Sequence, residues 1–268
     1  MLMFIKFFLK IIKLFIIVFS NFRKNQDLIS ELNIWLGIQQ GRNAPVTNKM
    51  EVSYISRFLS DSNQNIILDV GAHQGKYTDE IIKQFPNSKL YLFEPSKKSH
   101  EYLRSKYKNI DEIEIFDYCL SDTVGEKILY FNSDMDSRAT LTHREESRTN
   151  SYWKEKEVVK SNKLSEFWRN ELSYKQIDLL KLDVEGEEFT ILNDVKENLH
   201  KIRLVQFEFA ESNIATKIFF KDFWELLNDK FIIYRYTHFN QLNEIKEYSE
   251  YEEFFRFTNF LGVNKELN

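Results

Sequence analysis

The chain has 268 residues, 43% of them hydrophobic and 15% aromatic, which is enough for the core of one α/β domain of ordinary size with additions. Its formal charge of −4 gives no electrostatic basis for binding nucleic acid. The single cysteine, Cys119, excludes an intrachain disulfide and a multi-cysteine metal site, and it indicates a reducing, cytoplasmic compartment.

The first 24 residues are both apolar and basic. Lys6, Lys10 and Lys13 are spaced to lie on one face of a helix, and no acid precedes Asp27. Such a helix lies in a membrane interface with its lysines toward anionic headgroups. We therefore expect residues 1–24 to attach the protein to the inner face of the cell membrane. A spanning or signal-anchor helix, and a helix packed on the protein's own core, are the alternatives.

Residues 25–62 show a helical pattern with one apolar face. Leu28, Leu32, Trp35 and Leu36 share this face, and apolar positions recur after a loop at residues 41–45. We predict one or two helices that cover the main domain, which we place at residues 63–268.

A nucleoside-binding pattern begins that domain. An apolar run at residues 66–70 predicts a buried parallel strand, and Gly71 and Gly75 then permit positive φ or a close approach of backbone to ligand. A helix is predicted at residues 77–84, with free N–H groups at its start. The next apolar run, residues 90–93, ends at Glu94, which is placed to accept hydrogen bonds from a ribose diol.

The glycine spacing indicates which nucleoside is bound. A dinucleotide site has the spacing G-x-G-x-x-G, whereas this loop has G-x-x-x-G with Asp69 two residues upstream. S-adenosylmethionine has no phosphate, so a wider loop suffices, and Asp69 would face the cationic part of the cofactor. A nicotinamide or flavin site, and an ordinary strand–turn–helix with incidental glycines, are the alternatives.

Strand and helix patterns alternate through the rest of the chain. Helices are predicted at residues 97–106, 164–172, 187–192 and 216–228, and strands at 113–118, 127–131, 177–184, 204–209, 231–237 and 254–263. A hairpin turn is expected at residues 123–125 and a polar insertion at about 132–160. This alternation predicts a mainly parallel sheet with helices on both faces and a ligand site where the strands end.

The stretch at residues 177–189 carries the predicted chemistry. Lys181, Asp183 and Glu185 share one side of the chain if the strand continues that far. Carboxylates at the end of a central strand suit a methyl acceptor, because one can take the hydroxyl proton while another holds a sugar hydroxyl. Asp183 and Glu185 are therefore the predicted catalytic residues. A solvated strand end with helix-start acids, and a divalent ion held by Asp183, Glu185 and Glu208, are weaker interpretations.

Three further residues are candidates for contacts with the cofactor, on weaker sequence signals. His73 lies in the glycine loop, where it would touch the methionine end of the cofactor or be exposed. Ser121 and Asp122 follow the third strand and are placed to meet the adenine, or else to form a simple turn.

Four ordered motifs, ILDVGAHQGKYT, LFEPSKKSHEYL, LSDTVGE and IDLLKLDVEGEEFTIL, resemble the FkbM-type S-adenosylmethionine-dependent methyltransferases over about residues 64–210. The resemblance implies a class I methyltransferase fold, Rossmann-like, with a mainly parallel seven-stranded sheet, helices on both faces and an antiparallel last strand. It also implies O-methylation, frequently of sugar hydroxyls. The residues that we expect to bind the cofactor are Asp69, Gly71, Ala72, His73, Gly75, Tyr77, Thr78, Glu94, Pro95, Ser121 and Asp122.

The predicted function is O-methylation of a hydroxyl, most simply that of a sugar in a cell-surface glycan or glycolipid precursor, with S-adenosylmethionine as donor. One alternative is a methyltransferase for a diffusible small molecule or peptide. Another is a membrane-tethered binding protein that keeps the cofactor fold without catalysis. No protein-bound metal is expected, and no nucleic-acid partner.

Overall fold

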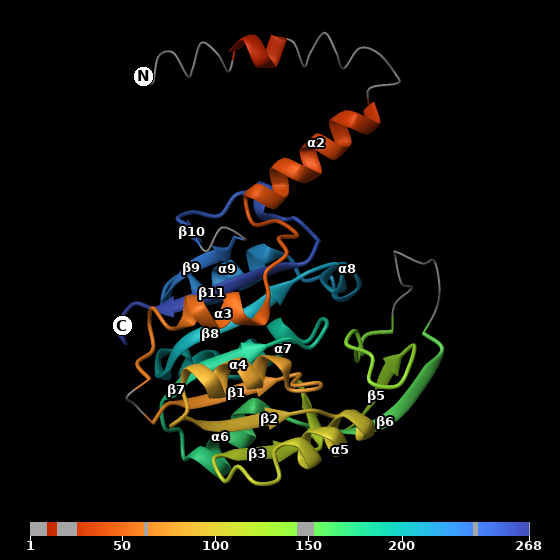
Figure 1. The fold of residues 1–268 in the computed structure, drawn as a ribbon, viewed down its shortest axis with the longest axis vertical. Coiled ribbons are helices and arrows are strands. Elements are labelled where there is room, and N and C mark those ends of the chain that lie inside the picture. The colour runs from red at the N-terminus through yellow and green to blue at the C-terminus, as the bar shows by residue number, and fades with distance from the viewer. Residues whose placement is uncertain (1–9, 15–25, 62–63, 144–152, 238–240, 268) are drawn as a thin grey trace.

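The computed structural model describes residues 10–14, 26–61, 64–143, 153–237 and 241–267. Within these residues, eight strands form one large sheet. They are β1 (Ile66–Val70), β2 (Lys89–Phe93), β3 (Ile113–Phe116), β7 (Ile177–Leu182), β8 (Ile202–Phe209), β9 (Phe231–Tyr236), β10 (Leu242–Ile245) and β11 (Thr258–Asn264). Their order across the sheet is β10-β9-β11-β8-β7-β1-β2-β3 (Figure 1).

The sheet has the topology that the resemblance implies. Strands β3, β2, β1, β7 and β8 run parallel, and β11 runs antiparallel to both β8 and β9. The predicted Rossmann-like class I methyltransferase fold with antiparallel C-terminal strands is thus confirmed. The expected count of seven strands is wrong, because β10 forms a hairpin with β9 and adds an eighth strand to the described sheet.

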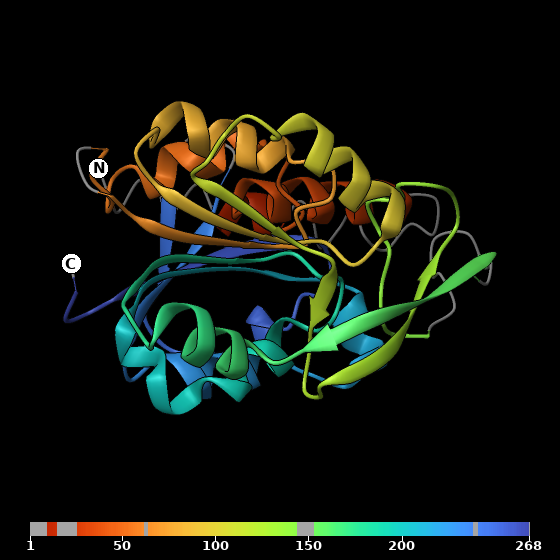
Figure 2. The same cartoon turned by 90° about the horizontal axis from the view of Figure 1, so that it is seen from below.

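Helices cover both faces of this sheet (Figure 2). One face carries α3 (Asn48–Ile55), α4 (Lys76–Gln84) and α5 (Lys97–Lys106), and the other carries α6 (Leu164–Leu172), α7 (Glu188–Asp194) and α9 (Phe220–Leu227). Alternate residues of β1 enter the two cores: Ile67 packs beneath α3 and α4, whereas Leu68 and Val70 pack against the opposite layer. A central strand buried on both faces explains its continuous apolar run.

A second, smaller sheet lies near the carboxyl ends of the parallel strands (Figure 2). It consists of β4 (Tyr118–Leu120), β6 (Glu155–Asn162) and β5 (Gly125–Phe131), in that order. The strand predicted at 113–118 is therefore two strands in different sheets. The polar insertion predicted at 132–160 is a strand from residue 155 onward, since β6 pairs along the whole of β5.

Two other predictions differ from the structure. The helix predicted at 216–228 is two helices, α8 (Ser212–Thr216) and α9, and the strand predicted from 254 begins at residue 258. Two short 3-10 helices, η2 (Lys196–Lys201) and η3 (Glu250–Glu252), complete the described elements.

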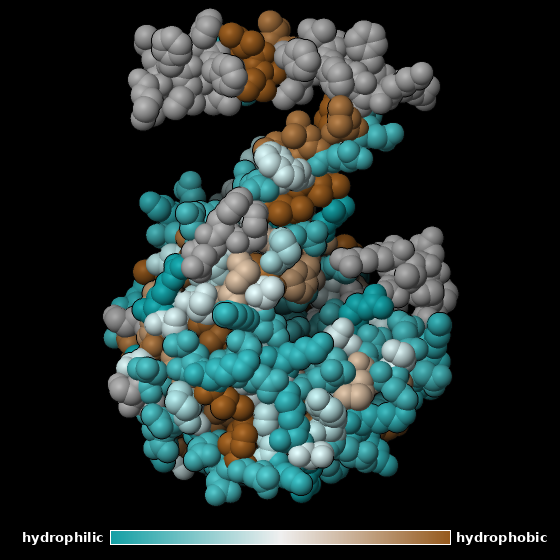
Figure 3. Space-filling model, in the orientation of Figure 1, coloured by the Kyte–Doolittle hydropathy of each residue, from teal (hydrophilic) through white to brown (hydrophobic). Residues whose placement is uncertain are grey.

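The N-terminal helices behave differently from one another. Helix α3 covers the sheet as predicted, with Val52 and Ile55 buried. Helix α2 (Gln26–Gln39) projects from the body (Figure 1), and the covering role predicted for it is wrong. The side chains of Leu28 and Trp35 are 54% and 55% exposed, and the apolar residues of α2 form a brown surface in Figure 3.

The predicted membrane-associating segment lies mostly outside the described residues. Residues 10–14 are helical and exposed. Among the described residues, no helix combines the length and apolar character that crossing a membrane requires.

Candidate active site

The glycine loop after β1 contains two glycines with positive φ. Gly71 has a φ of 83°, and a Cβ built there would overlap the carbonyl oxygen of Asp183 on the neighbouring chain segment. Gly75 has a φ of 70° and caps the start of α4. Both positions need glycine because an L side chain is strained at these angles and, at Gly71, meets backbone.

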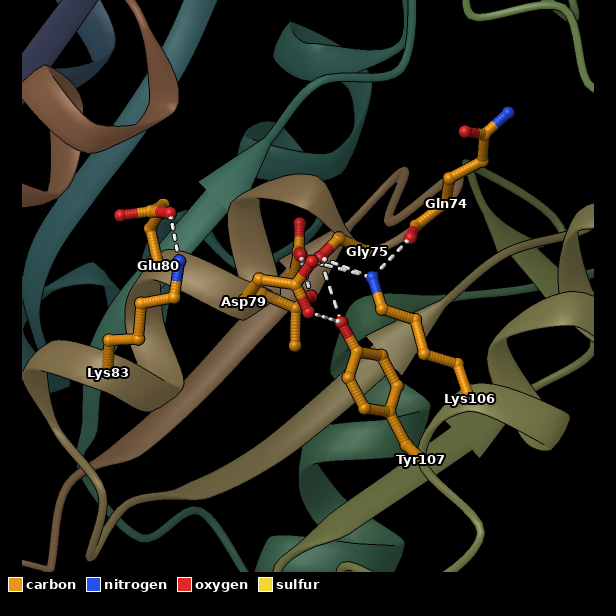
Figure 4. Close-up of polar contacts among 9 residues, drawn as sticks. Gln74, Gly75, Asp79, Glu80, Lys83, Lys106 and Tyr107 are labelled. Carbon is orange, nitrogen blue, oxygen red and sulfur yellow. Dashed lines mark hydrogen bonds and ion pairs between the residues drawn. The ribbon is translucent and has the colours of Figure 1, made fainter.

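Helix α5 fixes the far end of this loop (Figure 4). The Lys106 ammonium donates to the carbonyl of Gln74 at 2.9 Å and lies 2.6 Å from Asp79 Oδ2. The hydroxyl of Tyr107 lies 2.8 Å from both the carbonyl of Gly75 and Asp79 Oδ1. The loop is therefore held in place by protein contacts alone.

Glu94, at the end of β2, accepts two backbone hydrogen bonds. Its Oε2 accepts from the amide of His73 at 2.8 Å, and its Oε1 accepts from the amide of Ser96 at 2.9 Å. Each oxygen keeps a second lone pair for a ligand. Burial raises the pKa of Glu94 to about 7, and the two amides oppose that shift.

An apolar pocket opens beside Glu94. Its walls come from the ends of β1 and β2, from the small sheet and from residues 136–141; they include Val70, Phe93, Pro95, Cys119, Leu120, Leu129, Ala139 and Leu141. Burial raises the pKa of Cys119 to about 11, so this thiol acts as a small apolar wall group. A flat heteroaromatic base suits such walls, and Glu94 at their edge suits a ribose diol.

A polar pocket of about 410 Å³ adjoins the apolar one on the side of α3. The strand register builds its floor, because Lys181 and Gln206 lie abreast on β7 and β8, and Glu208 lies opposite Asn259 of β11. Its lining includes Glu51, Tyr77, Lys181, Asp183, Gln206, Glu208, Phe257 and Asn259.

The two pockets meet at Asp183. Four residues line both of them: Gly71, His73, Ser137 and Asp183. Of these four, only Asp183 carries a carboxylate, and its side chain is 48% exposed. If one pocket holds a donor and the other an acceptor, a group transferred between them passes beside the Asp183 carboxylate.

Lys181 connects Asp183 to the sheet. Its ammonium lies 3.3 Å from Asp183 Oδ2 and 3.1 Å from Asp69 Oδ1, and it stands 5.0 Å from the centre of the Tyr77 ring. The two carboxylates raise the pKa of Lys181 above its usual value against the opposing effect of burial. Lys181 therefore stays cationic, and it cannot serve as a base at neutral pH.

The loop after β7 is held by Glu188. This buried carboxylate accepts from the amides of Val184 and Gly186, both at 2.9 Å, and burial raises its pKa to about 8. Within the loop Glu185 has a φ of 56°, and its carbonyl accepts a hydrogen bond from Thr140. The alternation predicts that Glu185 shares one side of the chain with Lys181 and Asp183. This prediction is wrong for Glu185, because the strand ends at Leu182.

The structure brings many of the predicted site residues to the pockets. They are Gly71, Ala72, His73, Tyr77, Glu94, Pro95 and Asp183. His73 also places Nε2 2.7 Å from the carbonyl of Met135, which ties the glycine loop to the segment before β6.

The other predicted residues do not line either of these two pockets. Asp69 is buried and accepts from Thr78 at 2.7 Å, so its carboxylate serves Lys181 and α4 and does not line either pocket. Ser121 donates to Glu187 at 2.6 Å, and Asp122 pairs with Lys127 at 2.7 Å. Gly75 and Glu185 likewise do not line these two pockets.

Sequence reasoning did not identify several lining residues as site residues. Lys181 was recognisable from its place two residues before Asp183 on a strand. Glu51, Gln206 and Asn259 carry no local signal, since Glu51 contacts residues 155 and 208 positions away in the chain.

In the described part of the chain, no group of three or more His, Cys, Asp or Glu side chains is arranged to hold a metal ion, and this includes Asp183, Glu185 and Glu208. The residues do fit S-adenosylmethionine. The apolar walls suit its adenine, and Glu94 suits its ribose.

Comparisons with known proteins agree with this arrangement. The family model for the methyltransferase FkbM domain matches residues 69–248. The 2-O-methyltransferase NoeI of Sinorhizobium fredii is 23% identical over 165 residues, which cover 58% of this chain and 68% of NoeI.

Solved structures with a similar chain path include the precorrin-6y C5,15-methyltransferase of Geobacter metallireducens, at a TM-score of 0.43 and 9% identity over 83% of this chain and 90% of that one. A TehB-like S-adenosylmethionine-dependent methyltransferase of Corynebacterium glutamicum has a TM-score of 0.43 and 12% identity, over 88% and 97% of the two chains.

Because the family model matches more than half of the chain, the protein belongs to the FkbM family and is an S-adenosylmethionine-dependent methyltransferase.

Proposed function

We propose that the protein is an O-methyltransferase that methylates a sugar hydroxyl in a cell-surface glycan or glycolipid precursor. The observation that carries the proposal is the position of Asp183, where the apolar pocket with Glu94 meets the polar pocket. A polar pocket of this size suits a sugar ring better than an aromatic acceptor. The name of the NoeI relative, a 2-O-methyltransferase, supports transfer to oxygen.

Bound S-adenosylmethionine would supply a methyl group on a cationic sulfur, and the chain's own residues would prepare the acceptor. Asp183 would accept the proton of the acceptor hydroxyl as its oxygen takes up the methyl group. Lys181 holds the Asp183 carboxylate from below and orients it. We assign proton acceptance to Asp183 in preference to Glu185, since Glu185 does not line either of the two pockets.

Labelled methyl transfer tests this function. The full chain is incubated with methyl-labelled S-adenosylmethionine and fractions of the surface glycans of its host. The proposal expects label in a saccharide or lipid-linked saccharide, stable to base as an ether. Label found only in peptide or in small phenolic compounds would refute the sugar acceptor.

We also propose that residues 1–24 place this site at the inner face of the cell membrane. The supporting features are the lysine stripe of that segment and the exposed apolar residues of α2, Leu28, Leu32, Trp35 and Leu36. Full chain carrying Lys6→Glu, Lys10→Glu and Lys13→Glu should bind anionic vesicles at least tenfold more weakly than wild type. Equal sedimentation of the two proteins with vesicles would remove the membrane from the proposal.

A further inference from the structure

We propose that Glu51, Gln206 and Asn259 bind adjacent ring hydroxyls of a neutral sugar acceptor, and thereby select it over anionic acceptors. We call these three residues the acceptor triad. The inference rests on the proposed function and names the recognition element of that same site.

The acceptor triad is a connected, buried hydrogen-bond network. Glu51 Oε2 accepts from Gln206 Nε2 at 2.9 Å, and Glu51 Oε1 accepts from Asn259 Nδ2 at 2.8 Å. The Tyr77 hydroxyl donates to Gln206 Oε1 at 2.7 Å. Each member is at least nine-tenths buried and lines the polar pocket. The network thus fixes the side chains before any ligand arrives, which lowers the entropic cost of binding.

Its unused hydrogen-bonding capacity matches hydroxyl groups. Each amide nitrogen has two N–H groups and gives one to Glu51, so one donor on each remains. Each Glu51 oxygen has taken one bond and keeps a lone pair. Fixed donors beside fixed acceptors suit a hydroxyl, which donates and accepts at once. Phe257, at the rim of the same pocket, adds an aromatic surface for the C–H face of a sugar ring.

The charges in the pocket disfavour an anionic acceptor. Lys181, on the pocket floor, is already paired with Asp69 and Asp183. Glu51 and Glu208 add two more acids to the lining, each at most 8% exposed. Burial raises the pKa of Glu51 to about 7 and that of Glu208 well above its usual value, so these acids keep protons at neutral pH and the charge of the pocket floor is set by Lys181 and its two partners. A carboxylate or phosphate on the acceptor would lose its water without gaining a free cation from the pocket floor, because Lys181 is already shared by two carboxylates.

The triad lies largely outside the part of the chain that the family model matches. Glu51 belongs to α3 and Asn259 to β11, whereas the match covers residues 69–248. Two of the three residues of the acceptor triad thus lie in segments that flank the matched region, and the third lies within it.

Saturation-transfer NMR on the full chain tests the proposal, with S-adenosylhomocysteine present and three neutral probes: methyl β-D-glucopyranoside, methyl β-D-galactopyranoside and methyl α-D-mannopyranoside. Methyl β-D-glucuronide is the anionic probe. Wild type should bind at least one neutral probe and bind the glucuronide at least tenfold more weakly. Glu51→Gln keeps the shape but loses one acceptor oxygen, and it should weaken the neutral probe about tenfold.

Calorimetry with S-adenosylhomocysteine checks that each variant is folded and binds the cofactor product. Glu101→Gln, an exposed acid on α5, is the matched control and should match wild type in both measurements. Glu51→Gln should keep wild-type affinity for S-adenosylhomocysteine. Loss of that affinity with unchanged probe binding would overturn the proposal, because it would make Glu51 a cofactor ligand.

Two other results would also overturn it: unchanged probe binding in Glu51→Gln, or a wild type that binds the glucuronide and none of the neutral probes. In both cases methyl transfer to a saccharide would leave the proposed function standing. Absence of methyl transfer to any saccharide fraction is the separate result that removes that function.

Discussion

The ammonium of Lys181 lies 3.3 Å from the carboxylate of Asp183, at the place where the two pockets meet. The same ammonium lies 3.1 Å from buried Asp69. One cation thus neutralises an acid inside the sheet and orients an acid at the site. Asp69 therefore acts on the site indirectly, by holding the Lys181 ammonium that contacts Asp183.

Replacing Lys181 by Met should destabilise the protein by about 3–5 kcal/mol, because it leaves the Asp69 carboxylate buried without its cation. Urea unfolding measures the change. Lys83→Met is the control, since it removes an exposed ion pair with Glu80 and should leave the free energy of unfolding close to that of wild type. Equal stability of the two variants would contradict the role given to Lys181.

Gly71→Ala should weaken S-adenosylmethionine binding at least thirtyfold. The added Cβ overlaps the carbonyl of Asp183, which is backbone and cannot move away without displacing the catalytic residue. Gly125→Ala is the control, because Gly125 also has positive φ but nothing lies within 4 Å of the added atom. Calorimetry on both variants separates backbone strain from the overlap; similar binding by both would refute the argument.

The sequence allowed the sheet and the βαβ unit beside the apolar pocket to be predicted, since both depend on local signals. The apolar run before Gly71, the loop to Gly75 and the acid at Glu94 lie within one βαβ unit. The strand that ends before Asp183 was predicted in the same way, from its apolar run. All of these are confirmed as elements of the fold.

The acceptor half was not predictable in this way. Glu51 is brought to Gln206 and Asn259 only by the packing of α3 on the sheet, and no spacing in the chain records that contact. The spacing of apolar residues in α2 predicted a helix correctly. Periodicity does not show what packs against the apolar face, and in the structure this face is exposed. Strand β6 was missed because its solvent-facing side is charged and it lies in the small sheet.

Glu188→Gln should lower the rate of methyl transfer about tenfold or more with little change in S-adenosylmethionine affinity. A glutamine offers one carbonyl oxygen, so it cannot accept from both Val184 and Gly186, and the loop that follows Asp183 loses a support. Single-turnover kinetics with calorimetry measure the two effects. An unchanged rate would show that the loop keeps its shape without the Glu188 carboxylate.

Stability should fall as the pH rises from about 5 to about 8. The pKa values of Glu51 and Glu94 are raised to about 7, that of Glu188 to about 8, and that of Glu208 is raised as well, all mainly by burial. In this window the folded state keeps protons that the unfolded state, with ordinary carboxyl pKa values, has lost. His100, with a pKa lowered by burial, opposes the trend as a single group.

Thermal unfolding across this pH range measures the effect, and we expect a decrease of several degrees in Tm. Glu51→Gln should flatten the profile, because it removes one of the titrating groups. A Tm that rises steadily from pH 5 to pH 8 would contradict the burial of these four acids.

Glu94→Ala should weaken S-adenosylmethionine binding by at least tenfold, because it removes the acceptor expected for the ribose and leaves the amides of His73 and Ser96 without a partner. Calorimetry measures the affinity. Wild-type affinity in Glu94→Ala would show that the ribose is bound elsewhere.

The most direct test of the central claim is Asp183→Asn, measured for both cofactor binding and methyl transfer. Asparagine keeps the shape of the side chain where the two pockets meet but cannot accept the hydroxyl proton. We predict S-adenosylmethionine affinity within a few fold of wild type and methyl transfer reduced at least a hundredfold. Undiminished methyl transfer by Asp183→Asn would contradict the catalytic role of this carboxylate.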